Sequence, residues 1–357
     1  MEYINEAFAT NWVAPLGKNV TELENEVCAF VGRKHAVALS SGTAAIHLAL
    51  KALRVGKGDI VFCSSFTFSG SCNPIEYIGA KPVFIDCDKD TYNMCPIALE
   101  KAYKKYPNPK TVIIVNLYGN PASFDTLLNI TKAYNTPVIE DAAESLGAAY
   151  KGEQTGSFGD ISILSFNGNK IITTSGGGMA LTDNKEWRDK MLFWATQSRE
   201  NAPWYEHKEI GYNYRLSNIC AGIGRGQLTV LAKRVERKRE IYALYKAAFL
   251  NHKNIAMYPV NEGANCWLSV ALLDKECKVS FMDIITRLEK ENIEARPAWK
   301  PMHIQPVFQK YPFFSSLSKG SIAEDFFSRS VCLPSDTKMS DDDVKTIAKI
   351  IGEVIKD

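Results

Sequence analysis

Short apolar runs alternate with helical patterns between residues 20 and 230, and this rhythm limits the fold more than any other feature of the chain. Runs of this length that are apolar throughout are typical of strands buried in a parallel sheet. They lie at residues 36–39, 59–63, 81–85, 111–115, 137–139 and 161–165. Stretches with helical spacing separate them, at residues 21–31, 43–53, 96–106 and 123–134. These repeated units predict an α/β fold with a mostly parallel central sheet and helices on both faces.

The C-terminal part of the chain has a different pattern. A long helical stretch with many charges, residues 228–250, leads into a strand pattern at 266–273 and helical patterns at 281–292 and 340–355. Since 357 residues exceed the usual size of one domain, we expect two. The prediction is a large domain over residues 1–230 and a smaller α+β domain over residues 231–357.

Charge and cysteine content argue against several classes of function. The formal net charge is +2, and the densest basic stretch, residues 233–239, contains Glu236 and has helical spacing, so neither favours nucleic-acid binding. The nine cysteines include no Cys-x-x-Cys pair, which predicts free thiols, a reducing compartment and no metal site. No apolar run reaches about 18 residues and the N-terminus lacks an apolar signal segment. We therefore expect a cytoplasmic protein without a membrane span.

Lys170 lies between a predicted buried strand, residues 161–165, and the glycine run 176–178. Two interpretations are open. A lysine held in a cleft with a lowered pKa can form an imine with an aldehyde cofactor. Alternatively, the apolar runs on either side of Asn167-Gly168 form a hairpin, and the lysine is merely solvated. Taken alone, the segment favours the hairpin.

Three other segments follow predicted strands, at the edge where parallel sheets bind ligands. Residues 41–43 open a helix, so their amides and the Thr43 hydroxyl either face a phosphate or form an ordinary cap. Asp141 ends a strand, where it either holds a protonated ring nitrogen or caps a helix together with Glu144. Residues 66–70 follow the strand at 59–63, and one of their two aromatic rings, Phe66 or Phe68, either stacks on a flat heterocycle or packs in the core.

The order of these features resembles that of the sugar aminotransferases of the DegT/DnrJ/StrS family, which are fold-type I enzymes that use pyridoxal 5'-phosphate (PLP). The resemblance covers essentially the whole chain, and its matching segments are residues 12–17, 41–45, 140–144, 165–178 and 211–218. Within the family the chain is most similar to the bacillosamine-type aminotransferases. The segments that carry this likeness are the run from Ser165 to Met179, Arg296-Pro297 with Trp299 and Met302-His303, and residues 332–335.

The resemblance implies a reaction. An amino group would move from L-glutamate to the C4 ketone of UDP-4-keto-6-deoxy-N-acetylglucosamine, giving UDP-4-amino-4,6-dideoxy-N-acetylglucosamine and 2-oxoglutarate. The alternatives are another nucleotide-linked keto-6-deoxy sugar as acceptor, a PLP-dependent sugar dehydratase, or a non-catalytic relative. Lys170 favours transamination, because a related dehydratase branch has histidine at that position. The intact set of Lys170, Asp141 and Ser165 argues against a non-catalytic protein.

The resemblance also implies roles for individual residues. Lys170 would form the imine with PLP and move the proton during transfer. Asp141 would pair with the pyridine nitrogen, and Glu144, where the wider family usually has glutamine or histidine, would lie near the cofactor. The other cofactor contacts implied are Gly42, Thr43 and Ser165 to the phosphate, Phe68 to the ring, and Asn213 to the phosphate of the neighbouring subunit. The enzyme would then be a homodimer with a shared active site.

Contacts with the sugar nucleotide are expected from two segments near the cleft. The candidates are Arg199, Asn201, His207, Arg296, Trp299 and His303. Arginine suits a diphosphate because its guanidinium can bind phosphate oxygens in a bidentate manner. For His207 and His303 a structural hydrogen-bonding role is an equal alternative, and for Trp299 packing is the stronger one.

Overall fold

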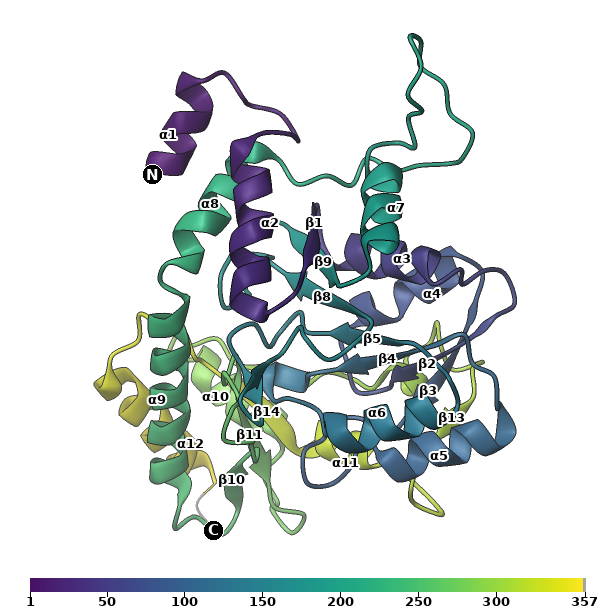
Figure 1. Cartoon of the computed structure of the whole chain (residues 1–357). Helices are drawn as coiled ribbons and strands as arrows, with labels where there is room; N and C mark the ends of the chain where they lie inside the picture. The colour runs from purple at the N-terminus through teal and green to yellow at the C-terminus, as the bar shows by residue number, and fades with distance from the viewer. Residues whose placement is uncertain (356–357) are drawn as a thin grey trace.

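The computed structural model describes residues 1–355, and its largest element is an eight-stranded sheet (Figure 1). The strands follow the order β1-β9-β8-β5-β4-β2-β3-β13. β9 is antiparallel to both of its neighbours, and every other adjacent pair is parallel. The expected α/β fold with a mostly parallel sheet is therefore confirmed.

The strands of this sheet are no longer than five residues. They are β1 (His35–Leu39), β2 (Ile60–Ser64), β3 (Lys81–Ile85), β4 (Thr111–Val115), β5 (Val138–Asp141), β8 (Ile161–Ser165), β9 (Gly178–Thr182) and β13 (Phe313–Phe314). A small separate hairpin consists of β6 (Ala149–Tyr150) and β7 (Glu153–Gln154). The expected strands at 81–85, 111–115 and 161–165 coincide with β3, β4 and β8.

Helices connect these strands, as the strand–helix rhythm predicts. They are α1 (Glu2–Ala9), α2 (Lys18–Val31), α3 (Gly42–Ala52), α4 (Asn73–Tyr77), α5 (Pro96–Lys105), α6 (Phe124–Ala133), α7 (Lys185–Ala195) and α8 (Asn218–Leu228). Two short 3₁₀ turns, η1 (Ser69–Ser71) and η2 (Leu117–Gly119), follow β2 and β4. Helix α8 was not expected, because its sequence contains three glycines, which disfavour helices.

Alternate residues of the central strands enter two different cores, which shows that both faces of the sheet are covered. Val61 and Cys63 of β2 pack with α3, α4 and α7, whereas Phe62 packs with α5 and α6. The same alternation continues in β4. At the other end of the sheet, α2, α8 and the start of α9 cover β1, β8 and β9. The strands are therefore apolar on both sides, which explains their continuous apolar sequences.

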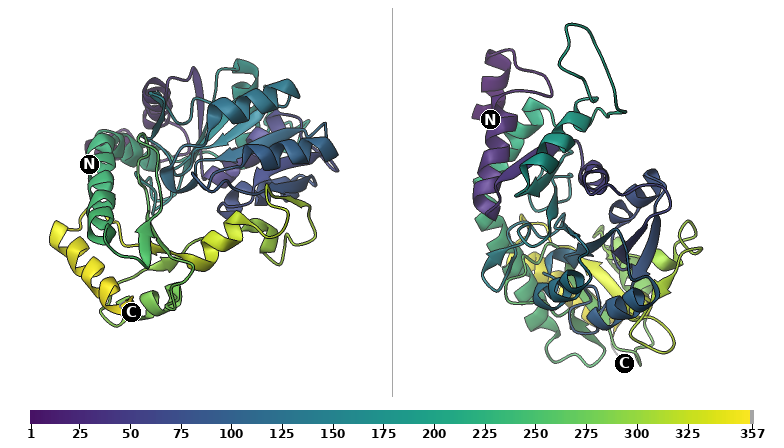
Figure 2. Two further views of the ribbon diagram at one scale, coloured as in Figure 1. Left: turned by 90° about the horizontal axis from the view of Figure 1, so that it is seen from below. Right: turned by 45° about the vertical axis from the view of Figure 1, so that its right-hand side comes forward.

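The C-terminal domain, which we define as residues 231–355, has its own four-stranded antiparallel sheet in the order β10-β11-β14-β12. Its strands are β10 (Ile255–Met257), β11 (Ser269–Leu273), β12 (Arg296–Pro297) and β14 (Ser330–Leu333). Its helices are α9 (Leu231–Phe249), α10 (Phe281–Glu289), α11 (Ile322–Arg329) and α12 (Asp341–Val354), with a 3₁₀ turn η3 (Met302–Ile304). These elements form a lobe to one side of the large sheet (Figure 2).

Part of the C-terminal domain returns to the large sheet, which was not expected. β13 pairs in parallel with β3 at the edge of that sheet. Just after it, Asp86 at the end of β3 accepts hydrogen bonds from the Ser321 hydroxyl and from the first amides of α11. A strand of two residues is too short to produce a periodic pattern of apolar residues, so the sequence could not have predicted this contact.

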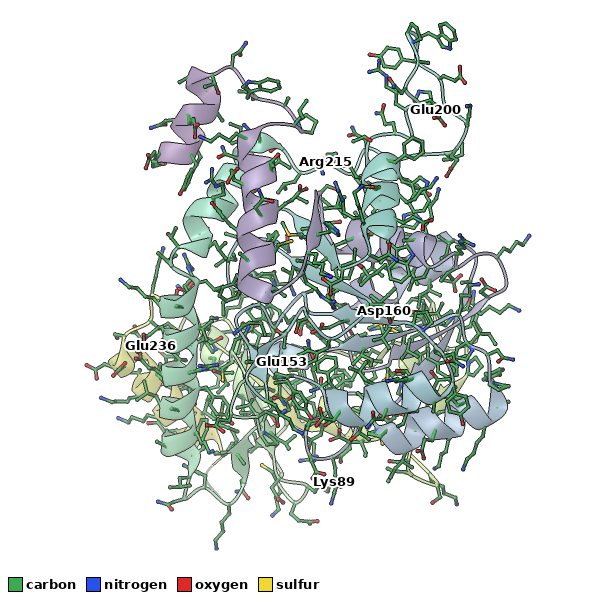
Figure 3. All side chains as sticks on the ribbon, in the orientation of Figure 1. Lys89, Glu153, Asp160, Glu200, Arg215 and Glu236 are labelled. Carbon is green, nitrogen blue, oxygen red and sulfur yellow. The ribbon has the colours of Figure 1, made fainter. Side chains whose placement is uncertain are left out.

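A long excursion between α7 and α8, residues 196–213, projects beyond the body of the molecule, and we call it the arm (Figure 1). Figure 3 shows Glu200 on the arm and Arg215 just after its base. Gln197 and Ser198 at the base both have left-handed backbone angles, with φ of 66° and 53°. Within residues 1–355, the helices include none with the length and apolar character that a membrane span requires.

Candidate active site

The site residues gather because five parallel strands end at the same edge of the sheet. β1 leads to residues 41–43, β2 to Phe68, β4 to Tyr118, β5 to Asp141 and Glu144, and β8 to Lys170. The structure therefore brings together the residues that the sequence placed after predicted strands.

Lys170 lies in the connection between β8 and β9, which pair as an antiparallel hairpin. The predicted hairpin across Asn167-Gly168 is therefore wrong, because the strand that pairs with β8 is β9 and not the apolar run after Lys170. Ile171 and Ile172 of that run are buried in the core. The lysine is not solvated, since only 11% of its side chain is exposed. The structure therefore contradicts the interpretation of a hairpin with a solvated lysine, and the imine-forming role of Lys170 stays a prediction.

The Lys170 amine lies among three groups that attract a cation. Its Nζ is 3.8 Å from Glu144 Oε1 and 4.1 Å from the centre of the Trp267 ring, and Asp141 is also close enough to act on it. Burial lowers the pKa of Lys170, and the two carboxylates oppose that shift. A buried amine whose pKa is lowered is more often neutral, and a neutral amine is a nucleophile and a base.

Glu144 is buried at the end of β5 and points its carboxyl group at Lys170. Burial raises its pKa to about 7, although the charge of Lys170 and the Tyr118 amide lower it. The Tyr118 amide donates to Oε2 at 2.7 Å, and Tyr118 itself has a left-handed backbone, with φ of 53°. A non-glycine residue in this conformation costs free energy and is found where the surroundings hold it. The strained turn η2 therefore orients the Glu144 carboxyl group.

Asp141 has both carboxylate oxygens hydrogen-bonded but retains acceptor capacity. The Ser71 hydroxyl donates to Oδ2 at 2.6 Å, and the Ala143 amide donates to Oδ1 at 3.1 Å. Burial raises the pKa of Asp141, while these two bonds and Lys170 lower it. Each oxygen has a second lone pair, so the carboxylate can accept one further N–H.

The amino end of α3 forms a small cradle of backbone. Ser41 caps the helix by accepting from the Ala44 amide at 3.0 Å, which leaves the amides of Gly42 and Thr43 at its first turn. A side chain on Gly42 would come within 3.3 Å of Ser165 Cβ, and one on Gly178 would come within 2.3 Å of the Gly42 nitrogen. Glycine at both positions lets β9 and Ser165 approach the helix end closely. Helix amino ends of this kind bind phosphate.

Phe68 and Trp299 form an aromatic wall beside this cradle. Their ring centres are 5.7 Å apart, and Trp299 also packs on Tyr118 at 4.9 Å. More than half of the Phe68 side chain is exposed, at 57%, so it is not a core residue. The exposed ring is available for stacking on a flat heterocycle. Trp299 is partly buried in the cluster, in line with its packing role.

Four of the expected binding residues lie on the arm and not in the cleft of their own chain. Arg199, Asn201, His207 and Asn213 are all exposed. Arg199 pairs with His207 across the arm, and its guanidinium lies 4.2 Å from the centre of the Tyr205 ring. The His207 ring also bonds to the Gln197 carbonyl oxygen at 2.8 Å. The structure therefore does not bring these four residues together with Lys170 within one chain.

The remaining two candidates differ from each other. Arg296 in β12 is exposed and forms an ion pair with Glu294, which is itself exposed, so its guanidinium is accessible. His303 is buried, with its ring nitrogens bonded to Ser65 at 2.6 Å and Glu324 at 3.0 Å, and it stacks on Phe313 at 3.6 Å. These contacts favour the structural role of His303 over substrate binding, because no ring nitrogen is free.

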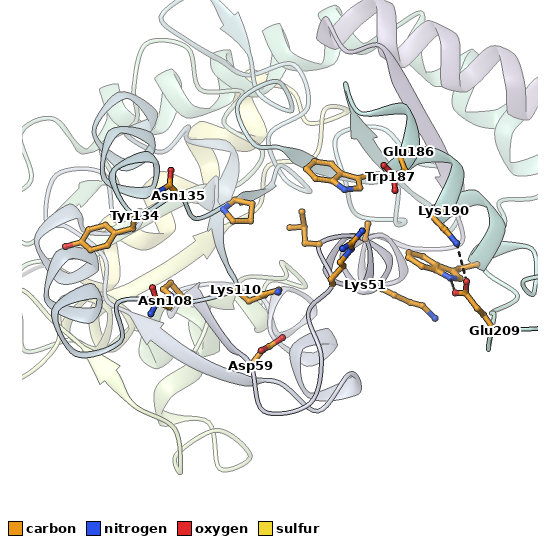
Figure 4. A pocket seen from close by; sticks show the side chains of 16 residues that line it. Lys51, Asp59, Asn108, Lys110, Tyr134, Asn135, Glu186, Trp187, Lys190 and Glu209 are labelled. Carbon is orange, nitrogen blue, oxygen red and sulfur yellow. Dashed lines mark hydrogen bonds and ion pairs between the residues drawn. The ribbon is translucent and has the colours of Figure 1, made fainter.

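A separate open groove of about 900 Å³ lies at the opposite end of the sheet (Figure 4). Asp59, Lys110 and Pro137, which line it, precede β2, β4 and β5. Its charged side chains are mixed in sign, and some pair with each other, as Lys190 does with Glu209. Among the described residues, none of the site candidates lines this groove.

Sequence reasoning missed three residues of the site. Ser71 holds Asp141, Tyr118 holds Glu144, and Trp267 of the C-terminal domain contacts Lys170. Ser71 and Tyr118 each lie a few residues after a predicted strand, and that position could have drawn attention to them. Trp267 is 97 residues from Lys170 in sequence, and no local pattern relates the two.

Comparisons with known proteins agree with this geometry. A model of the DegT/DnrJ/EryC1/StrS aminotransferase family matches residues 1–352. The chain is 50% identical to the "Putative pyridoxal phosphate-dependent aminotransferase EpsN" of Bacillus subtilis (strain 168), over 98% of this chain and 91% of that protein. It is 36% identical to the GDP-perosamine synthase of Escherichia coli O157:H7, over 100% of this chain and 95% of the synthase. The crystal structure of a DegT DnrJ EryC1 StrS aminotransferase from Brucella abortus is similar with a TM-score of 0.90 at 27% identity, covering 100% of this chain and 95% of that one.

Proposed function

Because the chain belongs to the DegT/DnrJ/EryC1/StrS aminotransferase family, and is a sugar aminotransferase that uses PLP, we propose that it moves the amino group of L-glutamate to the C4 ketone of UDP-4-keto-6-deoxy-N-acetylglucosamine. The products are UDP-4-amino-4,6-dideoxy-N-acetylglucosamine and 2-oxoglutarate. The observation that carries the proposal is the buried amine of Lys170, flanked by two carboxylates at the ligand-binding edge of the sheet.

The residues present fit PLP at both of its ends. The cradle at the amino end of α3, with the Ser165 hydroxyl, suits the phosphate, since added Cβ atoms at Gly42 and Gly178 would fill it. Asp141 keeps the acceptor capacity that a protonated pyridine nitrogen needs. Phe68 offers an exposed aromatic face. When bound, PLP supplies an aldehyde that takes up amino groups and a protonated ring that accepts electrons from a breaking C–H bond.

Lys170 is the group that holds the cofactor and moves the proton. Burial lowers its pKa, which favours the neutral amine, and the neutral amine can accept a proton from the α-carbon of the donor. Glu144 lies 3.8 Å away with a pKa of about 7, so it is able to share that proton with Lys170 near neutral pH. The Ser71 and Ala143 hydrogen bonds oppose the rise that burial causes in the pKa of Asp141, and in the ionised form this carboxylate would favour a protonated ring nitrogen.

The active enzyme is a homodimer in which the arm reaches the partner's site. The arm exposes Trp204, Tyr205 and Ile210, and the N-terminal segment exposes Trp12 and Leu16, which is an unusual amount of apolar surface for a monomer. Asn213, Arg199 and Asn201 lie on the same arm, away from the cleft of their own chain. A second copy that covers this surface would receive these polar groups near its phosphate and sugar-nucleotide sites.

The choice of UDP as the nucleotide of the acceptor rests on the sequence segments that resemble the bacillosamine-type aminotransferases. The relative named GDP-perosamine synthase makes a GDP-linked 4-keto-6-deoxy sugar the second candidate. Within one cleft the two acceptors differ in nucleobase and in the substituent at C2, so both use the same transfer chemistry. We also place the enzyme in the cytoplasm, because all nine cysteines are free thiols and most of them are buried.

The test is to incubate the PLP-loaded protein with L-glutamate and each of the two keto sugars, and to analyse the products by mass spectrometry and NMR. We expect a UDP-4-amino sugar from wild type and none from Lys170→Ala. Lys51→Ala is the matched control, because Lys51 also lies over a tryptophan ring but at the other end of the sheet. If only the GDP sugar is aminated, the UDP sugar is wrong and the GDP sugar is the acceptor. If glutamate leaves the cofactor unchanged, glutamate is not the amino donor.

A further inference from the structure

We propose that Trp267, which comes from the C-terminal domain, is a positioning residue for Lys170: it fixes the turn that carries the lysine and holds the lysine amine over its ring. The inference rests on the proposed role of Lys170 as the group that holds PLP and moves the proton. Trp267 is fully buried, and its ring lies 4.1 Å from the Lys170 Nζ.

The turn that carries Lys170 has few anchors of its own. Asn167, Gly168 and Asn169 are exposed. The turn is closed by a bond from the Lys170 amide to the Asn167 carbonyl oxygen, by an exposed side-chain bond from Asn167 to Asn169, and by a long bond of 3.5 Å from the Asn167 amide to the Ser165 hydroxyl. Trp267 Nε1 donates to the Asn169 carbonyl oxygen at 2.8 Å. Among the described residues, the other hydrogen bonds of residues 167–169 join members of the turn to each other or to Ser165 at the end of β8, whereas the Trp267 bond comes from the C-terminal domain. Without it, the residue next to the lysine would lose its link to the body of the protein.

Trp267 is itself held on several sides, so it can act as a fixed support. Its amide donates to Asn265 Oδ1 at 2.9 Å, and its carbonyl oxygen accepts from Lys238 Nζ at 2.9 Å. The Asn265 side chain in turn donates to the carbonyl oxygens of Glu144 and Leu146, at 2.9 and 3.0 Å. The same short segment therefore holds both members of the Lys170–Glu144 pair from one side.

A ring face attracts a cation, so Trp267 favours the protonated form of a nitrogen held above it. A lysine that is detached from the cofactor has a long flexible side chain, and catalysis requires it to stay within reach of the reacting carbon atoms. The Trp267 ring restricts where the amine can go, and the charge–ring attraction keeps it there. Loss of the ring should therefore slow proton transfer with little effect on substrate binding.

The variants Trp267→Leu and Trp267→Phe separate the two contacts, because leucine removes the ring and the N–H while phenylalanine removes the N–H alone. The first measurement is the pH titration of the visible absorbance of the PLP-loaded enzyme, whose midpoint reports protonation of the Lys170 nitrogen. We expect the midpoint to fall by about 0.5 to 1.5 pH units in Trp267→Leu, and by less than half of that in Trp267→Phe. The second is the rate of the glutamate half-reaction, which we expect to fall about tenfold in Trp267→Leu and at least threefold in Trp267→Phe, with unchanged glutamate affinity.

Trp194→Leu is the matched control. Trp194 is also buried, lies 4.7 Å below a lysine amine and donates its N–H to Glu209, but it is at the far end of the sheet. The proposal would be overturned if the pH midpoint of the visible absorbance in Trp267→Leu equals the midpoints of wild type and Trp194→Leu. If Trp267→Leu does not bind PLP, an unchanged half-reaction rate in Trp267→Phe would overturn it instead. Persistence of the visible band in Lys170→Ala would contradict the proposed role of Lys170, which is a different failure.

Discussion

Replacing Glu144 by glutamine would remove a charge beside Lys170 while keeping the local backbone. Glutamine has nearly the same shape, and its amide oxygen can still accept from the Tyr118 amide, which donates to Glu144 Oε2 at 2.7 Å. The left-handed turn at Tyr118 should therefore persist. The change that remains is electrostatic, because the carboxylate that stabilises the protonated form of Lys170 is lost.

The size of the effect follows from the distance between the two groups. Unit charges 3.8 Å apart attract by about 4 kcal/mol at an effective dielectric constant of about 20, which is an upper bound of about three pKa units. Glu144 has a pKa of about 7, so it is only partly ionised near neutral pH and the effect is smaller. We therefore expect Glu144→Gln to lower the pKa of the Lys170 amine by about 1 to 2 units.

The assay is chemical labelling of the cofactor-free protein, since an acylating reagent attacks only neutral amines. Mass spectrometry of the peptide that contains Lys170 gives the labelled fraction at each pH, and the midpoint gives the pKa. The control is Glu24→Gln, which removes a partly buried carboxylate, 3.1 Å from Arg215, without touching Lys170. A midpoint that stays in place or rises in Glu144→Gln would refute the electrostatic reasoning.

The same variant should change how stability depends on pH. Burial raises the pKa of Glu144 from 4.5 to about 7, so the folded protein holds this proton more tightly than the unfolded chain does. The contribution of Glu144 to stability is therefore greatest below pH 4.5 and is lost as the pH rises to about 7, by up to about 3 kcal/mol. Urea unfolding of the cofactor-free protein should show a weaker loss over this range in Glu144→Gln.

Three further changes probe the cradle, the aspartate and the histidine. Gly178→Ala would place a methyl group 2.3 Å from the Gly42 nitrogen, so we expect a loss of about 1 to 3 kcal/mol in thermal unfolding and PLP binding at least tenfold weaker by fluorescence titration. Ser71→Ala removes a 2.6 Å bond to Asp141, and should raise the pKa of that carboxyl by about 1 to 2 units, which would move the acidic limb of the half-reaction rate to higher pH. His303→Ala should cost about 1 to 3 kcal/mol of stability with an unchanged KM for the sugar, and a raised KM with unchanged stability would favour a substrate contact instead.

Much of the large domain could be predicted from the sequence because its strands are buried on both faces. The runs that became β3, β4 and β8 are mostly apolar, and their expected bounds agree with the structure. The run after Lys170 misled the prediction, because Ile171 and Ile172 are apolar in order to fill the core from a turn and not to form a strand. An apolar sequence indicates that a segment is buried, but it does not distinguish a buried strand from a buried turn.

The candidate site also has a part that could be predicted from the sequence and a part that could not. Residues that end predicted strands, such as Asp141 and Lys170, could be placed at one edge because parallel strands end together. The groups that orient them could not, since Tyr118 depends on a left-handed backbone angle and Trp267 on packing between distant segments. The projection of the arm could not be predicted either. Its polar residues were expected beside the cleft, and in our proposal that cleft belongs to the second copy of the chain.

The return of β13 to the large sheet has a consequence for dividing the molecule. The chain passes from the large sheet to the C-terminal domain at α9, returns between β12 and η3, and leaves again along α11. A fragment that ends at residue 230 would lack the strand beside β3 and would leave Asp86 without the amides and the hydroxyl that hold it. Such a fragment would carry an open sheet edge and a carboxylate that keeps only the Cys87 amide among the donors that the structure describes. We therefore expect it to aggregate, and we expect the two halves to complement each other only when they fold together.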